Sequence, residues 1–136
     1  MKLFIHLNFP GNCEQAFRYY EENLGGKILS LMKQSEAPGA SHNSEEADPV
    51  LHARMELAGA VLIGNDVPSD RLQPMRSAYL YLGADSKEEA ERIYSLLLRR
   101  GEAYMFVQET FYASHFSQLR DQFGILWTLI HERPMA

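Results

Sequence analysis

Apolar residues recur along this chain at two spacings, one typical of helices and one typical of strands. From Ala16 to Leu24 and from Ala90 to Leu98, apolar side chains repeat every three or four positions, which predicts two amphipathic helices. The signals that delimit them are Asn12 with Gln15 and Gly25-Gly26 for the first helix, and Ser86 with Glu89 and Gly101 for the second. Two helices of similar design therefore lie in the two halves of the chain.

Eight apolar runs of strand length surround the two helices. They are Lys2–Phe9, Ile28–Met32, Leu51–Leu57, Ala60–Asn65, Ser77–Gly83, Tyr104–Val107, Phe111–Leu119 and Ile125–His131. Two polar segments separate them. Gln34–Pro49 has no large apolar side chain and is predicted to be a solvent-exposed loop that includes His42, whereas Val67–Arg76, with two prolines, is predicted to be a linker. Each half therefore has the order strand, helix and three strands.

The two halves also resemble each other in sequence. At a shift of 74 residues, five identities align the helices: Glu14, Ala16, Arg18, Tyr20 and Leu24 fall on Glu88, Ala90, Arg92, Tyr94 and Leu98. A shift of about 65 places residues 59–63 on 124–128, each a glycine turn followed by an apolar strand. We therefore expect an α+β fold in one domain, with two tandem βαβββ modules, about 1–66 and 77–131, that form a curved mixed sheet around a cavity.

Composition excludes several classes of protein. The 136 residues suffice to bury a core without a structural metal, and a single cysteine, Cys13, cannot form a disulfide within the chain. The 18 acidic against 13 basic residues, without a basic cluster, argue against nucleic acid as a partner. No apolar run approaches the roughly 20 residues that span a membrane, and no export signal is visible near Met1. The expectation is a cytoplasmic protein.

Several short motifs resemble one known superfamily. The most specific are residues 108–112 (QETFY) and 121–127 (DQFGILW), supported by residues 8–13, 24–26, 52–54 and 61–66. These residues resemble the vicinal oxygen chelate superfamily, which includes glyoxalases, extradiol dioxygenases and bleomycin-resistance proteins, and most closely its PhnB-like branch. The resemblance covers almost the whole chain. It implies the paired-module fold, a cavity for a small-molecule ligand and, by analogy, a homodimer.

The resemblance also implies where a catalytic metal would be held. Members that use one place ligands on the first and last strand of each half, at positions that correspond here to Ile5, Ile63, Tyr79 and Thr128. None of these is a usual ligand of a divalent ion. A slip of one residue would bring in His6, but it would also reverse the face of the strand. We therefore expect no catalytic metal and no cofactor.

The cavity-facing residues follow from strand alternation and the resemblance. If Ala58 and Gly59 form a two-residue turn, Arg54 lies opposite Ile63, and cross-strand partners share a face. The predicted ligand-binding residues are Arg54, Glu56, Ile63, Asn65, Tyr79, Tyr81, Phe111, His115 and Thr128. His52, because imidazole exchanges protons near neutral pH, and Glu109, as a carboxylate, are the catalytic candidates.

Each of these residues also has a purely structural interpretation. His52 is also interpreted as a hydrogen-bonded structural histidine. Arg54 is alternatively one member of a solvated pair with Glu56 or with His52. Glu109 is alternatively a residue that caps or pins a loop. Cys13, in the first turn of a helix, is interpreted as a packed, unreactive thiol.

Three functions are compatible with this set of residues. They are a binding module for a small aromatic or anionic molecule, a metal-independent enzyme that transfers protons, and a metalloenzyme with relocated ligands from His52, Glu56, Glu109 and His115. The missing ligands at the four usual positions disfavour the third. Some relatives have a methyltransferase-like name, but no glycine-rich turn for a nucleotide-like cofactor is visible.

Overall fold

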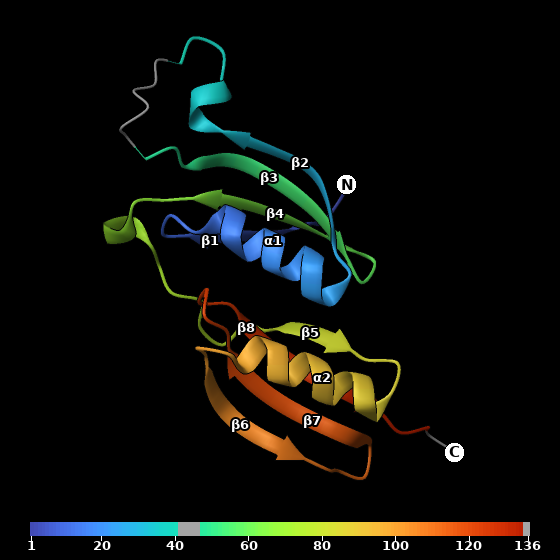
Figure 1. Cartoon of the computed structure of the whole chain (residues 1–136). Helices are drawn as coiled ribbons and strands as arrows, with labels where there is room; N and C mark the ends of the chain where they lie inside the picture. Colours follow the sequence, from blue (N-terminus) through green and yellow to red (C-terminus); the bar gives the residue numbers. More distant parts are fainter. Residues whose placement is uncertain (41–46, 135–136) are drawn as a thin grey trace. The chain divides into compact units, whose positions relative to one another are not determined.

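The computed structural model of this chain describes residues 1–40 and 47–134. His42, predicted to be an exposed loop residue, lies outside the described residues. The chain divides into two compact units, residues 1–73 and 74–136, with the boundary inside the predicted linker (Figure 1). None of the helices within residues 1–40 and 47–134 is long and apolar enough to cross a membrane.

The first unit is a βαβββ module. Its elements are β1 (Ile5–Phe9), α1 (Cys13–Leu24), β2 (Lys27–Lys33), the 3-10 turn η1 (Gln34–Glu36), β3 (Val50–Leu57), β4 (Ala60–Asp66) and the 3-10 turn η2 (Ser69–Arg71). The sheet has the order β1-β4-β3-β2, in which β1 runs parallel to β4 and the other neighbours are antiparallel. The helix α1 covers one face of this sheet, so the module has one covered and one open face (Figure 1).

The second unit repeats this arrangement. Its elements are β5 (Leu80–Gly83), α2 (Lys87–Leu98), β6 (Glu102–Gln108), β7 (Ala113–Arg120) and β8 (Leu126–Glu132). The sheet order β5-β8-β7-β6 is that of the first unit, and α2 is displaced from α1 by the 74 residues that the sequence repeat predicts. The prediction of an α+β fold with two tandem βαβββ modules is confirmed. The strands form one four-stranded sheet in each unit.

Two strands begin three residues later than their apolar runs predict. β1 starts at Ile5 and β5 at Leu80, so Tyr79 precedes its strand. Each strand starts where its parallel partner is available, Ile5 beside Leu62 and Leu80 beside Trp127. An apolar run reports side-chain composition, but the start of a strand depends on a partner far away in the sequence.

The core of the first unit lies between α1 and its sheet. Phe17 of α1 is wholly buried and meets Phe9 of β1 edge to face, with ring centroids 6.0 Å apart. A side chain at Gly64 of β4 would have no room, because its Cβ would lie 2.6 Å from Phe17 and 2.9 Å from the sulfur of Cys13. Burial, with a smaller contribution from Asp66, raises the pKa of the Cys13 thiol to about 12. These observations support the interpretation of Cys13 as a packed, unreactive thiol.

The two helices begin in different ways. At α2, Ser86 accepts a hydrogen bond from the backbone N–H of Glu89 at 3.0 Å, as predicted. At α1, Asn12 makes no side-chain capping bond, and its φ of −118° and ψ of 27° are not those of a typical capping residue. The carboxylate of Asp66 instead accepts the backbone N–H of Gly11 at 3.1 Å and of Cys13 at 2.9 Å. The prediction of a cap at Asn12 is therefore wrong.

Asp66 joins three segments of the first unit. Besides its two bonds at the start of α1, its second oxygen accepts the backbone N–H of Val50, the first residue of β3, at 2.9 Å. A negative charge at the start of a helix also complements the helix dipole. One carboxylate at the end of β4 thus holds both α1 and β3.

The turn between β3 and β4 contains a strained alanine. Ala58 has a φ of 50° and Gly59 of 82°, and Leu57 pairs with Ala60, so the predicted two-residue hairpin is confirmed. Positive φ costs an alanine about 1 kcal/mol, whereas asparagine tolerates it. We expect Ala58→Asn to raise the free energy of unfolding by about 0.5–1 kcal/mol in urea denaturation. A value below that of the wild type would contradict the turn geometry.

Candidate functional site

The open face of the first sheet carries the polar residues that the sequence singled out. Along β3, Ala53, Met55 and Leu57 are buried, whereas His52 and Glu56 alternate with them and are exposed. The registers Arg54–Ile63 and Glu56–Val61 are those predicted from the hairpin. Because cross-strand partners share a face, Arg54, Glu56 and Ile63 lie together on the open face.

The first strand contributes His6, and not Ile5, to this face. β1 is parallel to β4 with His6 beside Ile63 and Ile5 beside Leu62, and Leu62 is buried under α1. The His6 Nε2 atom also forms a hydrogen bond with Oδ1 of Asn65. The expectation that Ile5 shares a face with Ile63 is therefore wrong. The phase of a parallel pair is set by backbone hydrogen bonds between distant segments, which no local pattern reveals.

Arg54 is half-buried and has no carboxylate partner among the residues that the structure describes. Its guanidinium carbon lies 5.1 Å from the centroid of the Phe4 ring, a cation–π arrangement. Among the ion pairs between described residues, none joins Arg54 to Glu56 or to another acidic group within 4.0 Å. The structure therefore does not support the interpretation of Arg54 as an ion-pair partner of Glu56.

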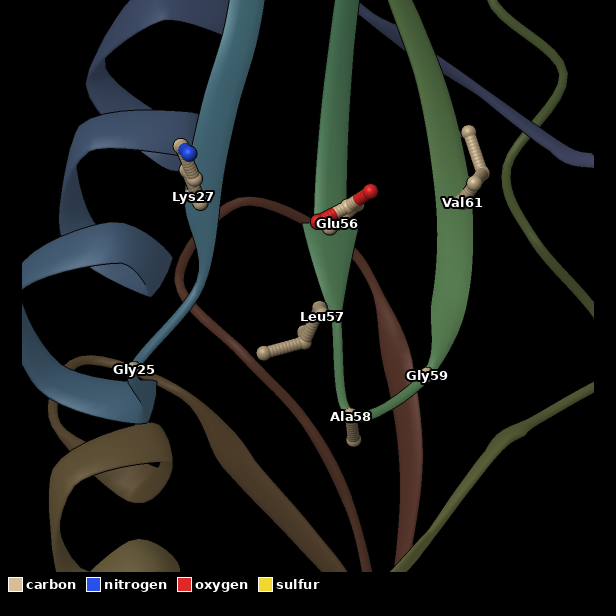
Figure 2. A pocket seen from close by; sticks show the side chains of 7 residues that line it. All are labelled: Gly25, Lys27, Glu56, Leu57, Ala58, Gly59 and Val61. Carbon is tan, nitrogen blue, oxygen red and sulfur yellow. The ribbon is translucent and has the colours of Figure 1, made fainter.

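A shallow hollow opens at the hairpin end of this unit (Figure 2). Its volume is about 400 Å³, and it is lined by Gly25, Lys27, Glu56, Leu57, Ala58, Gly59 and Val61. Lys27 and Glu56 are cross-strand partners on β2 and β3, and Figure 2 shows Glu56 on the strand between those of Lys27 and Val61. One cation and one carboxylate on adjacent strands give this hollow no net excess of charge.

The second sheet brings together Tyr81 and Thr128 on its open face. Tyr81 of β5 lies beside Thr128 of β8 in register, and Gln118 of β7 donates a hydrogen bond to the Thr128 hydroxyl at 3.2 Å. Thr128 is buried, with 3% of its surface exposed, whereas Tyr81 is 60% exposed and donates to Glu132 at 3.3 Å. Tyr79 precedes β5 and lines a hollow at the start of the second unit.

His115 lies on the opposite, helix-covered face of the second sheet. It is wholly buried, its Nε2 is 2.9 Å from the Ser117 hydroxyl, and its ring contacts Tyr94 of α2 with centroids 5.9 Å apart. Within residues 1–40 and 47–134, its Nδ1 has no hydrogen-bond partner. The structure therefore does not bring His115 together with Thr128, because residues of odd and even number along β7 face opposite sides.

Burial under α2 gives His115 a pH-dependent effect on stability. Burial lowers the pKa of His115, with Glu91 opposing this effect and Lys87 adding to it. At pH values between the lowered pKa of His115 in the folded protein and its ordinary pKa near 6.5, the unfolded chain binds more protons than the folded protein. The free energy of unfolding therefore falls as pH decreases through that interval. We expect His115→Gln to lose less unfolding free energy than the wild type between about pH 7 and pH 5. The exposed control His52→Gln should keep the wild-type slope, and equal slopes for all three proteins would contradict this assignment.

Glu109 is held between two cations on the surface. Its oxygens lie 2.9 Å from Nζ of Lys87, at the start of α2, and 3.1 Å from Nη2 of Arg133, which follows β8. The hydrogen bond and charge of Lys87, followed by Arg133, lower the pKa of Glu109, which makes it a weaker base. This geometry supports the interpretation that Glu109 pins the loop between β6 and β7.

Phe111, a predicted ligand-binding residue of the same loop, is 87% exposed and packs edge to face on Tyr112.

The motif of residues 121–127 has a structural role. Asp121 is buried, and one carboxylate oxygen accepts the backbone N–H groups of Phe123 and Ile125, both at 2.9 Å. The other oxygen accepts the indole N–H of Trp127, also at 2.9 Å. The hydrogen bonds of Asp121 therefore stabilise the turn that leads into β8 and fix the indole of Trp127 in the core.

Sequence reasoning missed two features of the open faces, His6 and Arg120. The signal for His6 was its strand position, which alternates with the buried Leu7. Arg120 follows the buried Leu119 at the end of β7 and lies opposite Leu126 on the open face. Strand alternation separates each residue from its buried neighbour, but only the pairing of β1 with β4 and of β7 with β8 shows that they lie on the open faces.

The paired βαβββ units define the class of protein, that of the vicinal oxygen chelate fold. Protein PA1353 from Pseudomonas aeruginosa has a similar structure, with a TM-score of 0.85, 28% identity and coverage of 98% of this chain and 99% of that one. A PhnB protein from Bacillus cereus, titled as a putative 3-demethylubiquinone-9 3-methyltransferase, has a TM-score of 0.82 at 23% identity over 96% and 99%. The fosfomycin resistance protein FosX of Listeria monocytogenes, in complex with Mn(II), shares the fold at a TM-score of 0.64 and 12% identity over 98% and 92%.

Sequence comparison narrows the class to a family. The family model described as 3-demethylubiquinone-9 3-methyltransferase matches residues 1–130. Protein YjdN of Escherichia coli K12 is 30% identical over 138 aligned positions, which cover 95% of this chain and 94% of YjdN. The chain belongs to this PhnB-like family of the vicinal oxygen chelate superfamily.

Proposed function

We propose that this protein binds a small anionic molecule with an apolar part on the open face of its first sheet. The observation that carries the proposal is the half-buried residue Arg54, whose guanidinium lies over the Phe4 ring and has no carboxylate partner among the described residues. The planar fork of an arginine matches a carboxylate or a phosphate through two parallel hydrogen bonds. An incoming anion would supply the counter-charge that the chain does not provide.

The register supplies a row of groups suited to such a ligand. Ile63 of β4 is the cross-strand partner of Arg54 on one side and of His6 on the other. Since neighbouring strands lie about 4.8 Å apart, the backbones of Arg54 and His6 are about 10 Å apart. The row offers a cation, an apolar centre and a hydrogen-bonded pair formed by His6 and Asn65. Apolar surface with a few convergent polar groups is typical of small-molecule sites.

The residues at the superfamily's metal positions do not fit a divalent ion. By register, the corresponding positions are His6 and Ile63 in the first unit and Tyr81 and Thr128 in the second, so His6 is the one usual ligand among the four. Isoleucine has no donor atom, and neutral hydroxyls are not the carboxylate or imidazole ligands that such ions take from proteins. The proposed function therefore includes no step through a metal.

Methyl transfer, which the family description names, is not part of the proposal. The β1–α1 connection, residues 10–12, contains one glycine, and the β5–α2 connection, residues 84–86, contains none. Neither is the glycine-rich turn that holds the phosphates or ribose of a nucleotide-like cofactor.

Proton transfer is a second candidate function of the same face. The hydrogen bond between His6 and Asn65 fixes the orientation of an imidazole one strand away from Ile63, where a ligand on Arg54 would extend. If His6→Gln abolishes turnover of a compound while binding of that compound survives, the enzyme is supported over the binding module.

The homodimer expected by analogy is also a proposal, and sedimentation at the mass of one chain would contradict it.

The anchor role of Arg54 is tested with benzoate, which combines a carboxylate with an apolar ring. In an NMR titration of the full chain, we expect saturable shifts of amide signals around Ile63. Arg54→Gln should weaken binding about tenfold, the equivalent of roughly 1.4 kcal/mol for a charged hydrogen-bonded contact. Arg71→Gln, which removes an exposed arginine of η2, is the matched control. Equal affinity of the wild type and Arg54→Gln would overturn the proposal.

A further inference from the structure

A second hollow, which we call the Arg76 hollow, lies at the start of the second unit. Its volume is about 460 Å³, and it is lined by Pro74, Arg76, Ser77, Tyr79, Tyr104, Arg120 and Leu126. Arg120 and Leu126 are cross-strand partners at the end of the open face of this sheet. The segment that leads into β5 forms the rest of the lining. Neither this hollow nor its two arginines belong to the face on which Arg54 lies.

Three hydrogen bonds to neutral acceptors hold the Arg120 guanidinium in this hollow. Its guanidinium donates to the carbonyl oxygens of Met75 at 2.8 Å and Gly124 at 2.9 Å, and to the hydroxyl of Tyr104 at 2.9 Å. All three acceptors are neutral. Glu102 is its cross-strand partner on β6, but no ion pair joins the two among the described residues. The positive charge of Arg120 is therefore held in place and left uncompensated.

Arg76 adds a second positive charge beside the first. It follows Met75, whose carbonyl Arg120 holds and whose sulfur lies 3.4 Å from the backbone nitrogen of Leu126. Arg76 is exposed, and no carboxylate lies within 4.0 Å of it among the described residues. Ser77 has a φ of 51°, a left-handed conformation that costs a non-glycine residue about 1 kcal/mol. Strain of this kind persists where the surroundings hold the chain, and it is concentrated at ligand sites.

We propose that the Arg76 hollow binds a small aromatic compound that carries a phosphate group. Two of its lining residues are cationic and none is anionic, in a chain whose net charge is −5, so the local field favours an anion against the overall charge. The phosphate is bound by Arg76 in the field of Arg120, and the rings of Tyr79 and Tyr104 provide surfaces for an aromatic body.

The test is an NMR titration of the full chain with phenyl phosphate, and in parallel with inorganic phosphate. We expect saturable shifts of the amide signals of Ser77, Tyr79 and Leu126. Arg76→Gln should weaken binding of both compounds at least fivefold, whereas Arg71→Gln, the exposed matched control, should leave both unchanged. Tyr79→Ala should weaken phenyl phosphate more than inorganic phosphate, because only the former has a ring.

Two results would overturn this inference. One is the absence of saturable shifts at residues 77–79, and the other is an equal loss of affinity in Arg76→Gln and Arg71→Gln, which would show a general charge effect. Arg54→Gln separates the two sites. If phenyl phosphate shifts only signals around Ile63 and loses them in Arg54→Gln, the Arg76 hollow is refuted and the proposed function of the first sheet is supported.

Discussion

Replacing Asp121 with alanine is expected to lower the free energy of unfolding by about 3–5 kcal/mol, the largest effect anticipated for a single substitution here. Its buried carboxylate accepts three N–H groups, from Phe123, Ile125 and the Trp127 indole. Alanine would leave those donors without their acceptor in surroundings where water is largely excluded. Buried donors that lose a charged acceptor cost more than the bond itself contributes.

The single tryptophan of the chain makes this measurement direct. Trp127 is 1% exposed and bonded to Asp121, so its fluorescence reports both unfolding and the loss of the bond in urea titrations. Asp121→Asn, which keeps one acceptor oxygen, should fall between alanine and the wild type. Asp70→Ala, at an exposed position of η2, serves as the control and should change stability by less than about 0.5 kcal/mol. A similar stability for Asp121→Ala and Asp70→Ala would refute the assigned role.

Replacing Gly101 with alanine is expected to destabilise the protein by about 3 kcal/mol. A Cβ at this position would lie 2.4 Å from the backbone oxygen of Arg120 and 3.2 Å from both the Cα of Asp121 and the backbone oxygen of Leu97. All three atoms belong to the backbone and cannot turn aside as a side chain can. The end of α2 and the end of β7 must therefore separate to admit one methyl group.

Gly83 offers a matched control for this substitution. A Cβ at Gly83, in β5, would meet no atom within 4 Å. We expect Gly83→Ala to leave stability nearly unchanged or to increase it by a few tenths of a kcal/mol, because alanine restricts the unfolded chain. Thermal unfolding of the two variants distinguishes close packing at Gly101 from a general effect of adding a methyl group. Equal midpoints would contradict the close approach.

Most of the fold followed from the sequence, and the details of the candidate site did not. Both helices end within a residue of their apolar patterns, and the hairpin at Ala58 and Gly59 has the predicted register. In contrast, His6 replaced Ile5 on the open face because β1 and β4 pair across more than 50 residues of chain. Whether Arg54 has an acidic partner also depends on the conformations of the side chains on neighbouring strands.

The two helix caps also differ in whether the sequence predicts them. Ser86 caps α2 from an adjacent position, so the spacing to Glu89 was enough to predict it. The first helix is capped by Asp66, which lies 53 residues from Cys13 in the sequence. The position of His115 in the second sheet also depends on long-range packing, because α2 covers the side of β7 on which His115 lies.

The sequence by itself determined the elements, their duplication and the alternation of side chains along each strand. These depend on periodicity and on the backbone preferences of residues such as glycine, which act over a few neighbouring positions. Only the tertiary structure decided the phase of β1 against β4, the carboxylate that caps α1, and the lack of an ion-pair partner for Arg54, Arg76 and Arg120 among the described residues. Those features arise from contacts between segments far apart in the chain, whose free energies no local pattern records.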